Sequence, residues 1–193
     1  QRALVGAHIN HGVALAEARD DAGSIAAYRR ALAVDDTNAT ARRNLGLALD
    51  KSGDRAGGIA ELRRAVEISP TPELKAALAS LLIGEGVSLA GAGRHQEAIP
   101  RYREAIDLDP TESRAHHNLA VALLAVGEPA AAVAAVERAQ ELEDSEAVRV
   151  LLSQALEARR DSRADAGDLS GALDDLGRAT LLRLKPPADA GAQ

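Results

Sequence analysis

The side chains best suited to chemistry in this sequence are its histidines. His8 and His11 are three residues apart, so on a helix they would share a face and could hold a metal ion weakly. His116 and His117 are adjacent, so on a helix they would point about 100° apart and could not easily share a metal ion. The chain contains an internal repeat, and His8, His11 and His116 fall at positions that the repeat fills with packing side chains. We therefore interpret all four as packing residues and predict no metal site.

Acidic residues also occur in pairs, but none of the pairs has the setting that acid–base catalysis needs. They stand at turns and expected helix starts, where carboxylates cap helices and face water: Asp20 and Asp21, Asp35 and Asp36, Glu143 and Asp144. The sequence contains no phosphate-binding loop, dinucleotide fingerprint, nucleophile elbow or HExxH metal motif. We predict no catalytic residue, no cofactor and no enzymatic activity.

The composition indicates an aliphatic core of packed helices. The 193 residues include no Cys, Met, Trp or Phe and only two Tyr, whereas Ala makes up about a fifth of the chain. Ala is the strongest helix former. The lack of Cys excludes disulfide frameworks and thiolate–zinc sites. No continuous apolar run reaches the length of about 18 residues that a membrane span needs, so we expect no membrane-spanning helix.

The charge balance argues against nucleic acid as a partner, because the net charge is −6 and the pI is about 5.4. Arg outnumbers Lys by 20 to three, which together with the Ala excess is typical of a GC-rich genome and favours a bacterial source. The lack of Cys fits either redox compartment, so cytoplasmic and exported locations both stay open. The sequence begins at Gln1 and not at Met, so we expect a processed product or a fragment of a longer protein.

An internal repeat organises the chain. Amphipathic stretches recur around five alanines whose spacing alternates between 34 and 40 residues: Ala31, Ala65, Ala105, Ala139 and Ala179. The duplicated unit is therefore a pair of consecutive repeats that together span 74 residues. A shift by 74 places Tyr28 on Tyr102 and Gly12 on Gly86, which indicates an internal duplication and not merely a shared composition.

The pattern resembles the motif of the tetratricopeptide repeat (TPR) family. The second repeat carries that motif as Leu45, Gly46, Leu49, Gly53, Leu62, Ala65 and Pro70. The resemblance covers residues 1–186 and implies an all-α, right-handed α-solenoid of five helix–turn–helix repeats. The expected repeats are 1–38, 39–72, 73–112, 113–146 and 147–186, followed by a Pro/Ala/Gly tail at 187–193.

Each expected repeat consists of two antiparallel helices, A and B, joined by a turn. Gly53, Gly93 and Gly127 suit the positive-φ position that ends helix A. Small Ala side chains would let A and B approach closely. In the 40-residue units the extra residues precede helix A, so 73–91 is predicted to form one long helix.

In the TPR family helix A lines a concave groove, and the resemblance implies a groove formed by Ile9, Val13, Arg43, Asn44, Leu47, Ile83, Val87, His117, Asn118, Val121 and Leu124. Chaperone-binding members hold a peptide carboxylate there with Lys, Asn and Arg. Leu47 stands where the second Asn of that clamp would be, which argues against such a clamp. The mostly aliphatic row fits an apolar helix or protein surface. The alternative is that small side chains simply close the groove.

Both ends of the expected solenoid carry apolar side chains that no element of the sequence is predicted to cover. Solenoids that stay monomeric usually end in a polar capping helix. The last helix, roughly 168–184, carries a leucine row instead: Leu173, Leu176, Leu181, Leu182 and Leu184. At the other end, Ala3, Leu4 and Ile9 match residues of the third repeat that would pack on a preceding repeat. With Pro186, these residues are predicted to form an end-to-end interface.

These features favour a protein-interaction scaffold that binds head to tail to copies of itself and builds a filament or other structural assembly. The alternative is an adaptor that binds an apolar peptide or helix of a partner protein in the groove. An enzyme, or the regulatory arm of one, is a third hypothesis, which the absence of catalytic motifs disfavours.

Overall fold

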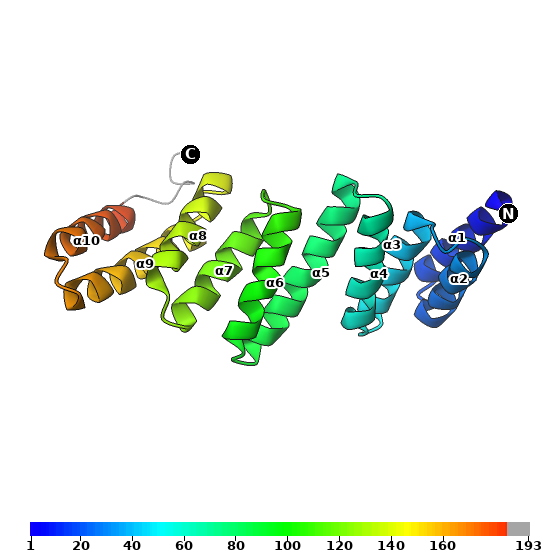
Figure 1. Ribbon diagram of the computed structural model, residues 1–193, viewed down its shortest axis with the longest axis horizontal. Coiled ribbons are helices and arrows are strands. Elements are labelled where there is room, and N and C mark those ends of the chain that lie inside the picture. Colours follow the sequence, from blue (N-terminus) through cyan, green and yellow to red (C-terminus); the bar gives the residue numbers. More distant parts are fainter. Residues whose placement is uncertain (185–193) are drawn as a thin grey trace, which may run out of the picture. The chain divides into compact units, whose positions relative to one another are not determined.

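In the computed structural model of the protein, residues 1–184 are described, and in this range they form α-helices and no β-strand (Figure 1). The ten helices are α1 (Arg2–Glu17), α2 (Asp21–Val34), α3 (Ala39–Lys51), α4 (Arg55–Ile68), α5 (Pro72–Gly91), α6 (His95–Leu108), α7 (Ser113–Ala125), α8 (Pro129–Leu142), α9 (Glu146–Asp165) and α10 (Leu169–Leu184). The predicted all-α class is confirmed. Pro186 and the predicted tail at 187–193 lie outside the described residues.

Consecutive helices pack as hairpins, with α1 on α2, α3 on α4, α7 on α8 and α9 on α10. Each predicted repeat range spans two helices, except that α5 and α9 begin one residue before their ranges. The chain divides into two compact units, Gln1–Gly84 and the residues from Glu85 onward, so the division falls inside α5.

The turn between helices A and B repeats with the same backbone geometry. Gly53, Gly93 and Gly127 have φ of 97°, 75° and 77°, as predicted from their place after helix A, and Gly167 follows with 83°. The first repeat places Arg19 at this position with φ of 60°. A left-handed conformation costs an L-residue about 1–2 kcal/mol, so this turn is held against the preference of its own residue.

Two tyrosine rings of helix B pack directly against glycines of helix A. A Cβ atom on Gly12 would lie 2.5 Å from Cε1 of Tyr28, and one on Gly86 would lie 2.5 Å from Cε1 of Tyr102. Both rings are buried. Since the two glycine–tyrosine contacts are related by the 74-residue shift, the duplication seen in the sequence is also a duplication of packing. The small residue at this contact is Gly, where the sequence suggested Ala.

Helix α5 is the one described helix whose length and hydropathy meet simple criteria for a membrane span, with a mean hydropathy of 1.4 over its most apolar window and 39% of that window buried. Leu78 and Leu82 of this helix are part of the hydrophobic core. One helix of this length and hydropathy is weak evidence for a membrane span. The predicted long helix at 73–91 is confirmed and begins one residue earlier.

Replacing Gly12 with Ala is expected to lower the free energy of unfolding by about 1–3 kcal/mol, because the new methyl group overlaps the Tyr28 ring. Gly6 of the same helix has nothing within 4 Å of its Cβ position. Gly6→Ala is therefore the matched control, and it should raise stability by about 0.5–1 kcal/mol through helix propensity. Urea unfolding followed by circular dichroism measures both. Equal effects of the two variants would contradict the close contact.

Candidate protein-interaction surfaces

One exposed apolar side chain recurs on helix A in four of the five repeats. Val13 and Leu47 belong to the first compact unit, and Val87 and Val121 belong to the second. Their spacings are 34, 40 and 34 residues, so they hold the same repeat position. The fifth repeat has the exposed Asp161 at this position. In each unit, then, two of the predicted groove residues present apolar surface to solvent.

The other predicted groove residues differ in accessibility. Arg43 is exposed, whereas a second group is half-buried: Ile9, Asn44, His117, Asn118 and Leu124. Ile83 is buried, with 5% of its surface exposed. Ile83 of α5 holds the same repeat position as Arg43 of α3, which is exposed. Helix α5 is apolar on more than one face, and there this position is buried. Ile83 therefore belongs to the core and not to the accessible row.

A pocket of about 170 Å³ adjoins Leu47 in the first unit, between helices α1, α2 and α3. Its walls include the buried residues Ser24, Tyr28 and Ala48. The lining is completed by Ala16, Asp21, Asn44, Leu47 and Lys51. Nζ of Lys51 lies 2.7 Å from Oδ1 of Asp21, so an ion pair between α3 and α2 is part of this wall. The pocket thus combines a small apolar space with the amide of Asn44.

His116 holds the loop between repeats. Its ring is buried, and Nε2 lies 3.1 Å from the carbonyl oxygen of Pro110. Arg42, 74 residues earlier, has the same role, because its Nε and Nη2 donate to the carbonyl oxygen of Asp36 at 3.0 and 2.7 Å. Among residues 1–184 no group of three or more His, Cys, Asp or Glu side chains is placed to hold a metal ion. The contacts of His116 fit the packing interpretation made from the sequence.

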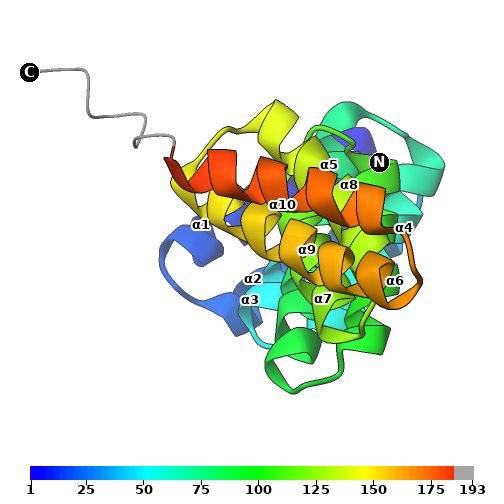
Figure 2. The ribbon, with the colours of Figure 1, turned by 90° about the vertical axis from the view of Figure 1, so that its left-hand side faces the viewer.

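The outer face of α10 is a row of exposed leucines: Leu169, Leu173, Leu176, Leu181 and Leu184. Leu182 is half-buried. Ala172, Asp175 and Ala179 lie on the opposite face, which packs on α9. Figure 2 looks onto this end of the protein, where α10 lies in front of α9 and no described helix lies over it. The helix is therefore amphipathic with its larger apolar side chains turned outward.

Repeat register shows how unusual this exposure is. Leu173 and Leu176 are 68% and 41% exposed. The residues at the same two positions one repeat earlier, Val133 and Val136, are both fully buried. Within the second unit these positions are covered when a further helix pair follows, since α9 packs on α8. At α10 the same surface is present without a described cover.

Helix α1 also exposes an apolar side chain at a position that is buried in other repeats. Leu4 is 51% exposed, whereas Leu78 and Leu152, at the same position in the third and fifth repeats, are each 2% exposed. Ala3 is also exposed and Ile9 is half-buried. These side chains lie on the face of helix A that packs against the preceding repeat, as α9 packs on α8 in the second unit.

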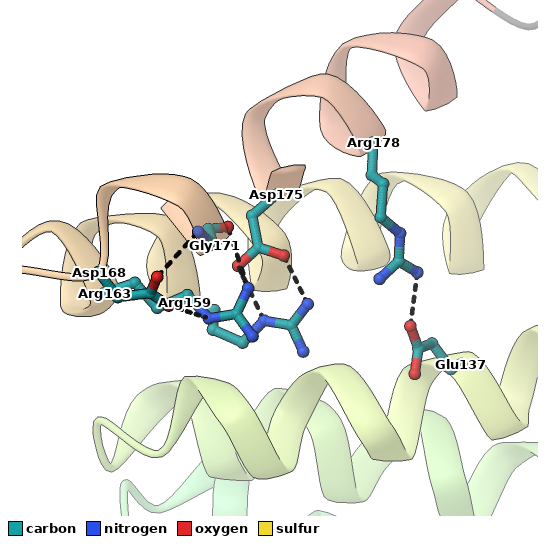
Figure 3. Close-up of polar contacts among 7 residues, drawn as sticks. All are labelled: Glu137, Arg159, Arg163, Asp168, Gly171, Asp175 and Arg178. Carbon is teal, nitrogen blue, oxygen red and sulfur yellow. Dashed lines mark hydrogen bonds and ion pairs between the residues drawn. The ribbon is translucent and has the colours of Figure 1, made fainter. Parts of the chain in front are cut away.

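A buried ion cluster fixes the orientation of α10 (Figure 3). Asp175 is 1% exposed, and its carboxylate accepts hydrogen bonds from Nε and Nη2 of Arg159 at 2.9 and 2.5 Å and from Nη1 of Arg163 at 3.0 Å. Nη2 of Arg178 lies 2.5 Å from Oε1 of Glu137 and ties α10 to α8. These contacts hold the face of α10 that carries Asp175 against α9, and the exposed leucines lie away from that face.

Burial by itself raises the pKa of Asp175, but the hydrogen bonds from Arg159 and the charges of Arg159, Arg163 and Arg178 outweigh it and lower the pKa below the ordinary value. Sequence reasoning did not find this cluster. The signal for it is the 74-residue register, in which Glu85 and Arg101 occupy the positions of Arg159 and Asp175 with the charges exchanged. Nε of Arg101 lies 2.8 Å from Oε2 of Glu85.

The hairpins, the positive-φ turns and, within each unit, the packing of one repeat on the next define a helix-hairpin repeat protein of the α-solenoid class. Two tetratricopeptide repeat models match the sequence, over residues 9–71 and 89–155. The chain belongs to the tetratricopeptide repeat family, as the motif predicted. Comparison with curated protein sequences finds no match.

Solved structures with the same fold include the crystal structure of MamA protein, at 19% identity over 95% of this chain and 93% of that chain, with a TM-score of 0.64. The AMB-1 form of MamA matches at 17% identity over 97% and 96%, with a TM-score of 0.58. YrrB, described as a TPR protein with an unusual peptide-binding site, matches at 18% identity over 91% and 84%, with a TM-score of 0.53. At these identities the likeness is one of fold.

Replacing Asp175 with Asn is expected to lower the free energy of unfolding at pH 7 by about 3 kcal/mol, because two guanidinium groups then lose a buried counter-charge. The folded-state pKa of Asp175 is lowered, so its contribution is present above the unfolded-state pKa of about 3.9 and is lost as the pH falls through the folded-state pKa. The difference between the two proteins should therefore shrink in acid. Urea unfolding at pH 7 and pH 3 tests this, with the exposed neighbour Asp174→Asn as the control. A difference that is the same at both pH values would contradict the assignment.

Proposed function

We propose that this TPR protein is a non-enzymatic interaction scaffold that self-associates head to tail through the outer face of α10 and the open face of α1. The observation that carries the proposal is the exposure of Leu173 and Leu176 at positions that are buried one repeat earlier. A surface with the pattern of an internal repeat junction favours another TPR helix as its partner. The exposure of Leu4, against the burial of Leu78 and Leu152, supports α1 as the second half of the contact.

The energetics support an association of useful strength. Full burial of a leucine side chain contributes about 1.5–3 kcal/mol. The α10 face offers five exposed leucines, and their summed gain must exceed the loss of translational and rotational freedom on binding. A well-fitted contact of this kind supports micromolar or tighter binding. Because the two faces are different, the contact is heterologous and each added copy leaves the same faces open at the ends.

Replacing Leu176 and Leu181 together with Lys is expected to abolish this self-association, because two ammonium groups would have to lose water at the junction. Light scattering over a range of protein concentrations measures the assembly, and circular dichroism checks that the helix content is unchanged. Leu47→Lys serves as the matched control, since Leu47 is an exposed leucine of α3, a helix that belongs to neither end face. A native protein that stays monomeric at high concentration, or a double variant that assembles as the native protein does, would refute the proposal.

A second candidate function is that of an adaptor that binds an apolar segment of a partner protein on the helix A surface. The pocket of about 170 Å³ beside Leu47 favours it, because an aliphatic side chain could enter that space while the Asn44 amide bonds to the partner's backbone. The description of YrrB, which has the same fold, as a TPR protein with an unusual peptide-binding site supports peptide binding as a candidate function.

Leu47→Glu is expected to weaken the binding of an aliphatic peptide, selected from a random library on the native protein, by about tenfold or more, since the contact buries a leucine. Val87→Glu tests the equivalent position in the second unit. Ile68→Glu changes an exposed apolar residue on helix B and is the control. Calorimetry measures the affinities. Unaltered binding by both groove variants would exclude this surface as the site.

A further inference from the structure

A hollow of about 690 Å³ lies at the open end of the first unit, where the start of α1, the end of α2 and the following loop meet. Its apolar part is formed by Val5, Leu32, Ala33 and Val34. Its polar part is formed by Gln1, Arg2, Asp35, Asp36 and Thr37. One turn of helix with its side chains, 5.4 Å long and about 10 Å across, occupies about 400 Å³. The hollow is therefore large enough for the end of a helix.

The loop beside the hollow is fixed and acidic. The backbone N–H and the hydroxyl of Thr37 donate to Oδ1 of Asp35 at 3.0 and 2.7 Å. These hydrogen bonds lower the pKa of Asp35, so its carboxylate is charged near neutral pH. Arg42 holds the carbonyl oxygen of Asp36. Both carboxylates are thus presented from a loop whose backbone is held in place.

The last turn of α10 has the matching chemistry. Leu181 and Leu184 are 69% and 74% exposed, so this turn presents two aliphatic side chains to solvent. Arg183 lies between them in the sequence and bonds to Glu157 of α9. A guanidinium group has five N–H donors, so Arg183 can keep that bond and still donate to another carboxylate.

We infer that the hollow of one copy receives the last turn of α10 from a second copy, with Leu181 and Leu184 against Val5, Leu32 and Val34, and Arg183 facing Asp36. The inference rests on the head-to-tail proposal and names the acceptor site for it. A second copy is favoured over other occupants for two reasons. The donor turn carries Arg183 beside its leucines, and the 35–37 loop on one side of the hollow carries Asp35 and Asp36, while Arg2 lies on the α1 side. Leu4 also lies next to Val5, at a repeat position that is buried when another repeat precedes it.

The absence of cysteine from the sequence makes a site-directed test clean. Ala33 is exposed and lines the hollow, and Leu184 is exposed at the end of α10. Two single variants, Ala33→Cys and Leu184→Cys, are prepared and treated with a short bis-maleimide, separately and after mixing. We expect a cross-link in the mixture that joins the Ala33 position of one copy to the Leu184 position of another. Neither variant alone should form a cross-link.

Other outcomes separate the inference from the proposal on which it rests. A cross-link in Leu184→Cys alone would indicate tail-to-tail contact and would overturn the inference. Continued assembly in light scattering without the mixed cross-link would overturn the acceptor site and leave head-to-tail association standing. A protein that does not associate at all would refute both.

A charge exchange gives an independent readout. Asp36→Lys and Arg183→Glu should each weaken self-association by about threefold, and their combination should restore it. Arg30→Glu, which changes an exposed arginine of α2 that does not line the hollow, is the control. Failure of the combination to restore association would count against the pairing of Arg183 with Asp36.

Discussion

The structure depends on one constraint: a helix hairpin of this size cannot bury its own apolar surface. Helix B packs on its own helix A with one face and turns another toward the next repeat. Tyr28 shows both contacts, because its ring fills the space beside Gly12 and also packs with Leu45 and Leu49 of α3. Within each unit a repeat is thus stabilised by its neighbour along the chain, and the burial of a given position depends on whether a neighbour is present.

Features that depend only on the repeat spacing could be predicted from the sequence, whereas features that depend on contacts between helices could not. Hairpins, turns and the long helix at 72–91 follow from spacing, and spacing is visible in a single sequence. Turn glycines such as Gly53 are recognisable because few other residues adopt positive φ without strain. Arg19 occupies the same place in the first repeat, and only the register identifies it as a turn residue. The details that were missed depend on which side chains meet across helices.

Asp175 illustrates a contact between helices that the sequence alone did not indicate. Read alone, an Asp in an amphipathic helix suggests a solvated face, yet this one is buried against Arg159 and Arg163. In the third repeat the corresponding pair, Glu85 and Arg101, has the charges exchanged and is more exposed. An ion pair works equally well in either direction, so the repeat does not keep a fixed residue type at these positions. The groove residue Ile83 was misplaced for a related reason, since register identifies its position on helix A and cannot give the depth of that position in α5.

The same neighbour rule separates the two candidate functions. A groove partner would occupy surface that is exposed in repeat after repeat, as with Val13 and Leu47, and it would not require the ends of the chain. An end-to-end partner would occupy surface that is exposed on α1 and α10 but buried at the same repeat positions elsewhere, as with Leu173 and Leu4. The second kind of surface has its complement within the same protein, because internal junctions already bury these positions.

The α10 face and the α1 face are also different from one another, so two copies cannot satisfy both faces by a simple twofold pairing. Assembly through this contact therefore continues from copy to copy unless the chain of copies closes into a ring.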